Sequence, residues 1–93
     1  MELYTMRYVL AVAELGSFSL ASQACHVGQP ALSQQVARLE KELGLALFTR
    51  SSRGVALTEA GREFVRRAGE IVQRADALQA EMALYAGVRR GTL

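Results

Sequence analysis

The chain has 93 residues, of which 51% are hydrophobic, so it is long enough for one small domain with a modest core. Its net charge of +2 argues against a non-specific nucleic-acid binder, although ten of the eleven cations are arginine, which suits bidentate contacts with phosphate and guanine. A single cysteine excludes an internal disulfide, and there is neither an apolar run of membrane-spanning length nor a signal-peptide pattern, so we expect a cytoplasmic protein.

Two short helices are predicted at the start of the chain. Apolar residues recur at helical spacing over residues 3–15, which predicts a first helix with one buried face. That face consists of Leu3, Met6, Val9, Leu10 and Ala13. Gly16 can end this helix, and Ser17 can cap a second helix over residues 18–25. The inward residues expected in the second helix are Phe18, Ala21, Ala24 and Cys25.

A third helix is predicted between Gly28 and Gly44, with its body over residues 30–43. Its apolar face is formed by Leu32, Val36, Leu39 and Leu43. The rest of its surface offers amides, a hydroxyl and cations, which are carried by Gln29, Ser33, Gln34, Arg38 and Lys41. These groups can donate hydrogen bonds to phosphates and base edges, so this surface is a candidate for reading DNA. Taken alone, the pattern also fits a solvated amphipathic helix.

The connection between the second and third helices is short. It consists of His26, Val27 and Gly28. Two short helices joined by about three residues that include a glycine are typical of a helix-turn-helix. We expect Val27 to pack under both helices and to fix their crossing angle.

A β-hairpin is predicted after the third helix. Two apolar runs, residues 45–48 and 55–57, flank a polar segment with a glycine at residues 49–54. Strands this short need support, so the hairpin should lie on the three-helix core as a wing. Arg50 and Arg53 are expected at or beside its tip, where they could reach phosphate or the minor groove. Alternatively, these arginines only keep an exposed loop soluble.

Thr58 is expected to cap a long helix over residues 59–88. Apolar residues along this helix alternate steps of four and three, which is the spacing of a heptad seam. The seam consists of Phe64, Ala68, Ile71, Ala75, Leu78, Met82 and Tyr85. Outside the seam, Glu63 with Arg67 and Glu70 with Arg74 form favourable i, i+4 pairs.

This long helix also predicts a partner. It would be about 45 Å long, too long for a head of some sixty residues to bury its whole seam. Its first turns, including Phe64 and Val65, should pack on the head. We infer a homodimer through the remainder of the seam, where the alanines would allow close approach. Gly87 is expected to end the helix, which leaves residues 89–93 as a hinge.

No enzyme chemistry is indicated by the sequence. It lacks the HExxH, P-loop and GxGxxG motifs and the paired Cys or His spacing of metal sites, so no catalytic residue, metal or cofactor is predicted. Cys25 and His26 are neighbours, but a catalytic pair needs a third orienting group. Cys25 is expected to pack as a small buried hydrophobe.

Several motifs follow one another at characteristic spacing: QPALS from Gln29, RLEKELG from Arg38, LF at residues 47–48, an arginine, and LTEAG from Leu57. In this order they resemble the N-terminal winged helix-turn-helix of LysR-type transcriptional regulators, and the resemblance covers the whole chain. It implies a mainly α fold, with three helices and a short hairpin wing followed by a long dimerisation helix. It also implies a bacterial transcription factor.

The resemblance implies a division of the chain and a set of DNA contacts. Residues 1–58 would bind double-stranded DNA, 59–88 would dimerise, and 89–93 would lead to an effector-binding domain outside this chain, which would take a small molecule. The helix over 30–43 would enter the major groove of a dyad promoter site. DNA contacts would come from Gln29, Pro30, Ser33, Gln34 and Gln35, and all of these except Pro30 would read bases. Positioning contacts would come from Arg38, Lys41, Arg50 and Arg53.

Three positions differ from the common pattern of the family. Gly28 stands where serine is frequent, Ser22 where alanine is common, and Gln34 where arginine is frequent. Gln34 cannot form an arginine–guanine pair but can form a glutamine–adenine pair, so we expect an operator of its own. The competing hypothesis is a protein-docking module that binds a partner through the polar helix face without DNA specificity.

Overall fold

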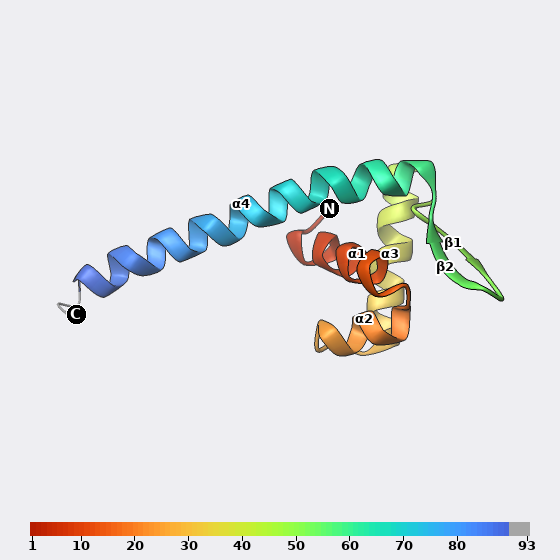
Figure 1. Cartoon of the computed structure of the whole chain (residues 1–93), viewed down its shortest axis with the longest axis horizontal. Coiled ribbons are helices and arrows are strands. Elements are labelled where there is room, and N and C mark those ends of the chain that lie inside the picture. The colour runs from red at the N-terminus through yellow and green to blue at the C-terminus, as the bar shows by residue number, and fades with distance from the viewer. Residues whose placement is uncertain (90–93) are drawn as a thin grey trace.

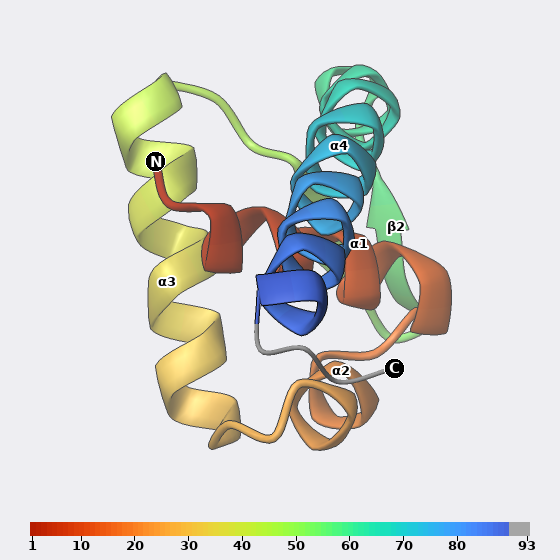
Figure 2. The same cartoon turned by 90° about the vertical axis from the view of Figure 1, so that its left-hand side faces the viewer.

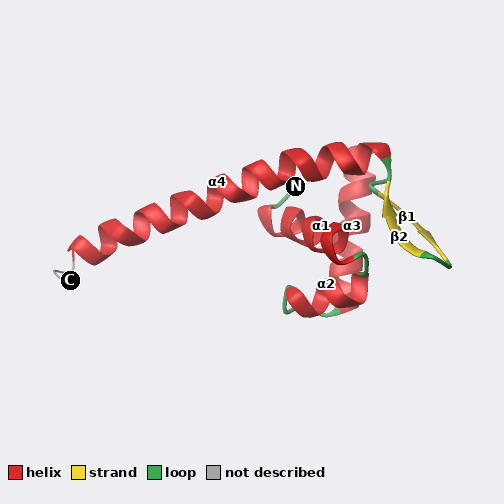
Figure 3. Cartoon of the chain, in the orientation of Figure 1, coloured by secondary structure: helices red, strands yellow, loops and turns green. Residues whose placement is uncertain are grey.

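A long projecting helix follows a head that is built from three helices and a hairpin. The computed structural model describes residues 1–89. In chain order, its elements are α1 (Leu3–Leu15), α2 (Phe18–Ala24), α3 (Gln29–Leu43), β1 (Phe48–Ser51), β2 (Gly54–Leu57) and α4 (Glu59–Arg89). Helices α1 to α3 and the hairpin form the head, and α4 crosses it and extends far beyond (Figures 1 and 3). The molecule measures 55 × 24 × 20 Å. The predicted winged helix-turn-helix with a long final helix is confirmed.

The ends of the first three helices follow from local sequence. Gly16 and Gly44 end α1 and α3 in the left-handed conformation, with φ of +65° and +74°, which glycine adopts without steric cost. The hydroxyl of Ser17 accepts a hydrogen bond from the Leu20 N–H at 3.1 Å and caps α2. Pro30 lies in the first turn of α3, where its missing N–H costs nothing.

The core lies where α1, α2 and α3 meet under the hairpin. It consists of Val9, Val12, Phe18, Ala21, Leu32, Val36, Leu39, Leu47 and Phe48. The apolar face predicted for α3 is confirmed except at its end, where Leu43 is exposed.

The faces predicted for α1 and α2 are partly wrong. Helix α1 buries Thr5, Val9 and Val12, because α4 also packs against it and the helix has covered surface on more than one side. The third buried residue of α2 is a serine, since the hydroxyl of Ser22 is satisfied by donating to the Ser19 carbonyl at 2.7 Å. Ala24 is exposed and Cys25 is only half-buried, so Cys25 is not the buried hydrophobe we expected.

The turn of the helix-turn-helix takes its left-handed conformation at a residue other than glycine. Its left-handed residue is His26, with φ of +57°. Gly28 has an extended backbone and precedes the first residue of α3. Val27 is half-buried and packs against the core, as predicted.

The first strand of the hairpin is shifted along the chain relative to the prediction, whereas the second begins only one residue earlier than predicted. Strands β1 and β2 pair antiparallel, with Phe48 opposite Leu57 and Ser51 opposite Gly54, so the turn consists of residues 52 and 53. Residues 45–47 do not extend β1, because hydrogen bonds to α3 hold the chain at this point. The Glu40 carboxylate accepts hydrogen bonds from the N–H groups of Leu47, at 2.7 Å, and Phe48, at 3.3 Å.

Helix α4 is anchored to the head at its beginning. The hydroxyl of Thr58 accepts from the Gly61 N–H at 2.9 Å and donates to the Ala46 carbonyl at 2.7 Å, so the predicted cap also ties α4 to the segment before the hairpin. Phe64 and Val65 pack against the core, as expected. Further along, the Arg7 guanidinium of α1 pairs with Asp76 at 2.8 Å.

Two expectations for α4 are wrong. The helix continues through Gly87 to Arg89, so Gly87 does not end it and Arg89 is helical rather than part of a hinge. Residues 90–93, the rest of the predicted hinge, lie outside the described residues. The ion pairs along the helix are the i, i+3 pairs Glu63–Arg66 and Arg67–Glu70, not the predicted i, i+4 pairs.

Candidate nucleic-acid interface

Helix α3 presents its polar side to solvent. Figure 2 shows α3 at one edge of the molecule, with no other element over its outer side. The buried positions of α3 are Leu32, Val36 and Leu39. At 3.6 residues per turn, the side directly opposite carries Pro30, Gln34 and Lys41, and all three are exposed. Arg38 adjoins them and is also exposed, as is Gln29 at the start of the helix.

Ser33 and Gln35 lie on the two flanks of this exposed side, and both are half-buried. Ser33 shares its flank with Glu40, the residue that holds the start of the hairpin. Gln35 is on the flank that faces the start of α1. The structure therefore separates the four predicted base-reading residues: Gln34 is outward, Gln29 is at the helix start, and Ser33 and Gln35 lie at the edges.

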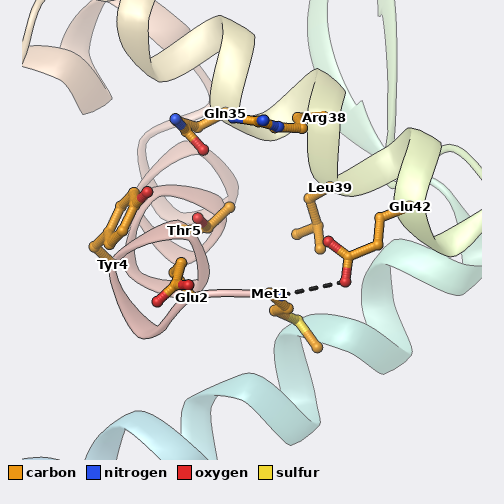
Figure 4. Close-up of a pocket in the computed structure, with 8 residues that line it drawn as sticks. All are labelled: Met1, Glu2, Tyr4, Thr5, Gln35, Arg38, Leu39 and Glu42. Carbon is orange, nitrogen blue, oxygen red and sulfur yellow. Dashed lines mark hydrogen bonds and ion pairs between the residues drawn. The ribbon is translucent and has the colours of Figure 1, made fainter.

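A groove separates α3 from the start of α1. It has a volume of about 280 Å³ and is lined by Met1, Glu2, Tyr4, Thr5, Gln35, Arg38, Leu39 and Glu42 (Figure 4). The Met1 amine pairs with the Glu42 carboxylate at 3.2 Å. Gln35 and Arg38 thus border a polar groove as well as the outer surface of α3.

The hairpin places its two arginines differently. Arg53 is exposed in the turn, where its N–H donates to the Ser51 hydroxyl at 3.2 Å, and Figure 1 shows the tip projecting away from α3. Arg50 lies within β1 rather than at the tip. Its guanidinium carbon stands 3.8 Å from the centre of the Phe18 ring, a cation–π contact.

Four candidate cations have no acidic partner. Among the ion pairs of residues 1–89, none involves Arg38, Lys41, Arg50 or Arg53. The arginines of α1 and α4 that do pair, such as Arg7, lie elsewhere on the molecule. The cations of α3 and the hairpin therefore carry charge that no neighbouring carboxylate neutralises.

Across residues 1–89, no group of three or more His, Cys, Asp or Glu side chains could hold a metal ion. In the same residues no helix has both the length and the apolar character needed to cross a membrane.

Sequence reasoning missed two residues that position the candidate interface. Glu40 joins α3 to the start of the hairpin through a hydrogen bond, and the Phe18 ring forms the cation–π contact with Arg50. Glu40 looked like an ordinary charged residue on a polar helix face, and nothing in the sequence indicated that its carboxylate accepts hydrogen bonds from backbone N–H groups. Phe18 was assigned to the core, but nothing in the spacing indicated that a hairpin arginine would cover its ring.

Comparison with known proteins identifies relatives of this chain. A family model described as "Bacterial regulatory helix-turn-helix protein, lysR family" matches residues 3–62. The chain is 49% identical over 77 residues to the HTH-type transcriptional regulator BudR of Klebsiella aerogenes, covering 83% of this chain and 54% of that protein. It is 44% identical over 82 residues to the HTH-type transcriptional regulator YcgK of Bacillus subtilis (strain 168), covering 88% of this chain and 25% of YcgK. It thus spans between a quarter and about half of these relatives.

Solved structures show the same fold at 37% sequence identity. The BenM DNA-binding domain in complex with catB site 1 DNA superposes with a TM-score of 0.87, over 92% of this chain and 96% of that one. The CbnR DNA-binding domain in its DNA complex gives a TM-score of 0.83, over 92% and 99% of the two chains. Both similar structures are complexes with DNA.

Proposed function

Because the chain belongs to the LysR family of bacterial regulatory helix-turn-helix proteins, we propose that it is the sequence-specific DNA-binding domain of a transcriptional regulator. The observation that carries this proposal is the outer side of α3, which is uncovered and polar and is accompanied by cations without acidic partners. Amides and cations on an exposed helix can read base edges and neutralise phosphates. BenM and CbnR, whose domains have this fold, are solved on DNA.

In this proposal α3 enters the major groove. Gln34 reads a base from the centre of the exposed side, and Gln29, Ser33 and Gln35 read from the helix start and the flanks. Pro30 shapes the first turn against the DNA backbone. Arg38 and Lys41 bind phosphates beside the groove, and Arg53 at the hairpin turn reaches phosphate or the minor groove.

A homodimer through α4 forms part of the proposal. Beyond the head, α4 exposes large apolar residues: Ile71, at 47% exposure, Leu78, at 58%, Met82, at 49%, and Tyr85, at 63%. A second copy would cover them, and a two-fold axis would match a dyad DNA site. Ala68 is 3% exposed within its own chain and Phe64 packs on the head, so these two seam residues have little surface left for a partner. Ala75 follows Ile71 in the seam and is half-buried, so its exposure is intermediate between the two sets.

The whole protein would carry its regulatory input elsewhere. The relatives are longer than this chain, so we place a small-molecule effector on a further domain and no cofactor on this one. The relatives are named as transcriptional regulators, which fits a binding protein rather than an enzyme, and such a regulator would act in the cytoplasm, on the chromosome.

In-vitro selection tests the proposed function. The wild-type chain should enrich one sequence with dyad symmetry from a pool of random duplexes, and bind it more tightly than unselected DNA at physiological salt. Specific sites are typically bound about a thousandfold or more tightly than non-specific DNA. If no sequence is enriched and both duplexes bind equally, the protein-docking alternative replaces the proposal.

A further inference from the structure

We propose that Arg50 is a positioning residue, which fixes the wing to α2 through the Phe18 ring and thereby sets where Arg53 meets DNA. This inference rests on the proposed function and refines it, because Arg50 would then act through Arg53 rather than bind phosphate itself. It also differs from the sequence-based expectation, which put both arginines on DNA.

Strand geometry turns Arg50 toward the head. Side chains alternate between the two faces of a strand, so Arg50 shares its face with Phe48, two residues earlier. Phe48 is buried in the core. Across the hairpin, Leu57 is opposite Phe48 and Val55 is opposite Arg50, and both of these residues pack against the core. Arg50 therefore occupies a head-facing position of the wing.

Arg50 packs on the ring of Phe18, the first residue of α2. Phe18 is 5% exposed, and the Phe48 ring meets it edge-on, with centroids 5.7 Å apart and planes at 72°. The guanidinium carbon of Arg50 lies 3.8 Å from the Phe18 ring centre. The contact thus joins the hairpin to the helix-turn-helix itself. Contact with the ring occupies one face of the guanidinium and leaves its in-plane N–H donors free, so the affinity and salt dependence of Arg50 variants must separate positioning from a phosphate contact.

The Arg50–Phe18 contact can control the hairpin turn because of its position along the hairpin. The start of the hairpin is held by Glu40 and Thr58. Arg50 and Val55 form the last level at which the hairpin packs on the head, and beyond them are Ser51, Gly54 and the two turn residues. Two-stranded hairpins are only marginally stable by themselves, so losing this level would let Arg53 sample many positions. Fixing Arg53 in one position on DNA would then cost binding free energy.

Three variants separate positioning from direct contact, measured on a duplex that the wild-type chain has selected from a random pool. Arg50→Ala removes the ring contact and should weaken binding about two- to fivefold, the range of an exposed cation–π contact. Arg50→Met keeps contact with the ring without the charge, so its affinity and salt dependence should stay near wild type. In an Arg53→Ala background, Arg50→Ala should have no further effect on affinity.

A measurement without DNA reports the contact independently. The ring current of Phe18 should shift the side-chain proton resonances of Arg50 in the NMR spectrum of the free chain, and Phe18→Leu should abolish the shift. Circular dichroism and thermal melting confirm that each variant is folded.

The outcomes that overturn the inference are distinct. If Arg50→Met and Arg50→Ala both reduce the slope of log K against log salt by about 0.9 per lost contact, with or without Arg53, Arg50 binds phosphate directly. That result would leave the proposed function intact. If the wild-type chain binds no duplex, the proposed function fails and the positioning role fails with it, even where the ring-current shift shows the Arg50–Phe18 contact.

Discussion

At the scale of single residues, His26 supplies the left-handed backbone conformation in the turn of the helix-turn-helix. Its φ of +57° is unfavourable for most side chains, although histidine, asparagine and aspartate tolerate it better than others. The nearby Gly28 could have supplied this conformation but is extended. The turn into α3 therefore contains a left-handed residue that neither helical spacing nor the length of the connection indicated.

Replacing His26 by a β-branched residue should strain this turn. We expect His26→Val to destabilise the fold by about 1–2 kcal/mol, the cost of the left-handed conformation for a residue with a bulky Cβ. Urea unfolding followed by circular dichroism measures this change. His26→Gly is the matched control and should be much less affected than the valine variant. Equal stability of the valine variant and wild type would contradict the strain.

Gln34 is the residue on which sequence preference should depend most. It is exposed at the centre of the outer side of α3, whereas Gln35 is half-buried at the edge. Gln34→Ala should lose roughly 1–3 kcal/mol of discrimination at one base position, as expected for a bidentate amide–adenine pair. Binding to matched and single-mismatch duplexes measures it. Lys41→Ala, the control, should weaken both duplexes alike, and the same pattern for Gln34→Ala would refute base reading.

At the scale of elements, the start of α4 is fitted against the segment before the hairpin. A Cβ atom at Gly61 would lie 2.0 Å from the Leu47 carbonyl oxygen and 3.0 Å from a Leu57 methyl carbon. Only a residue without a side chain allows this crossing. The same Leu47 carbonyl accepts the Thr58 N–H at 3.0 Å, so the obstructing group is itself held in place.

Gly61→Ala should therefore destabilise the head strongly. We expect a loss of about 3 kcal/mol, the upper end for overpacking, since a backbone carbonyl must shift. Gly69→Ala is a matched control on the same helix. Nothing lies within 4 Å of a Cβ at Gly69, so this variant should gain roughly 0.5–1 kcal/mol from helix propensity. Thermal melts of both variants test the contrast, and similar melting temperatures would contradict it.

The order and type of all six elements could be predicted because each has a local cause. Capping by Ser17 and Thr58 and termination by Gly16 and Gly44 depend on neighbouring residues. The hairpin shift could not be predicted in the same way, because Glu40 holds the Leu47 N–H through a contact that only the folded chain creates.

The same distinction between local causes and contacts made only in the folded chain applies to the candidate site. The exposed face of α3 followed from helical periodicity, so Gln34 and Lys41 lie where expected. The contact of Arg50 with Phe18 joins residues 32 positions apart and had no signal in the spacing. Ala68 shows the same limit, since a seam residue can face its own head or a partner and the heptad pattern is identical in both cases.

At the scale of the whole molecule, the proposed dimer depends on the outer half of α4. Ile71→Glu places a charge in the exposed apolar seam and should convert dimers to monomers in light scattering. Glu70→Gln, at an exposed neighbouring position outside the seam, is the control and should leave the molar mass unchanged. Dimers that persist in the Ile71 variant would mean that another surface holds the two copies together.

The Arg7–Asp76 pair makes the attachment of α4 to α1 sensitive to acid. The hydrogen bond from Arg7 lowers the pKa of Asp76 below its ordinary value of 3.8, and the pKa of Arg7 is raised. A lowered carboxyl pKa stabilises the fold above the ordinary pKa, and this stabilisation is lost as pH falls through the lowered value. An NMR titration of the Asp76 carboxyl should show a midpoint below 3.8, and Arg7→Ala should return it toward 3.8. Identical midpoints would show that Arg7 exerts no influence.

The same ion pair gives α4 a pivot. From Asp76 to Arg89 the helix continues for about 20 Å at 1.5 Å per residue, and Figure 1 shows this part standing clear of the head. A tilt of roughly 10° at the pivot would move the far end by about 3.5 Å on this length. Torque applied at the far end is transmitted to the head through this ion pair and through the packing of α4 on α1 and on the core. A partner bound at the far end of α4 would therefore act on the angle of the head through a lever arm of about 20 Å.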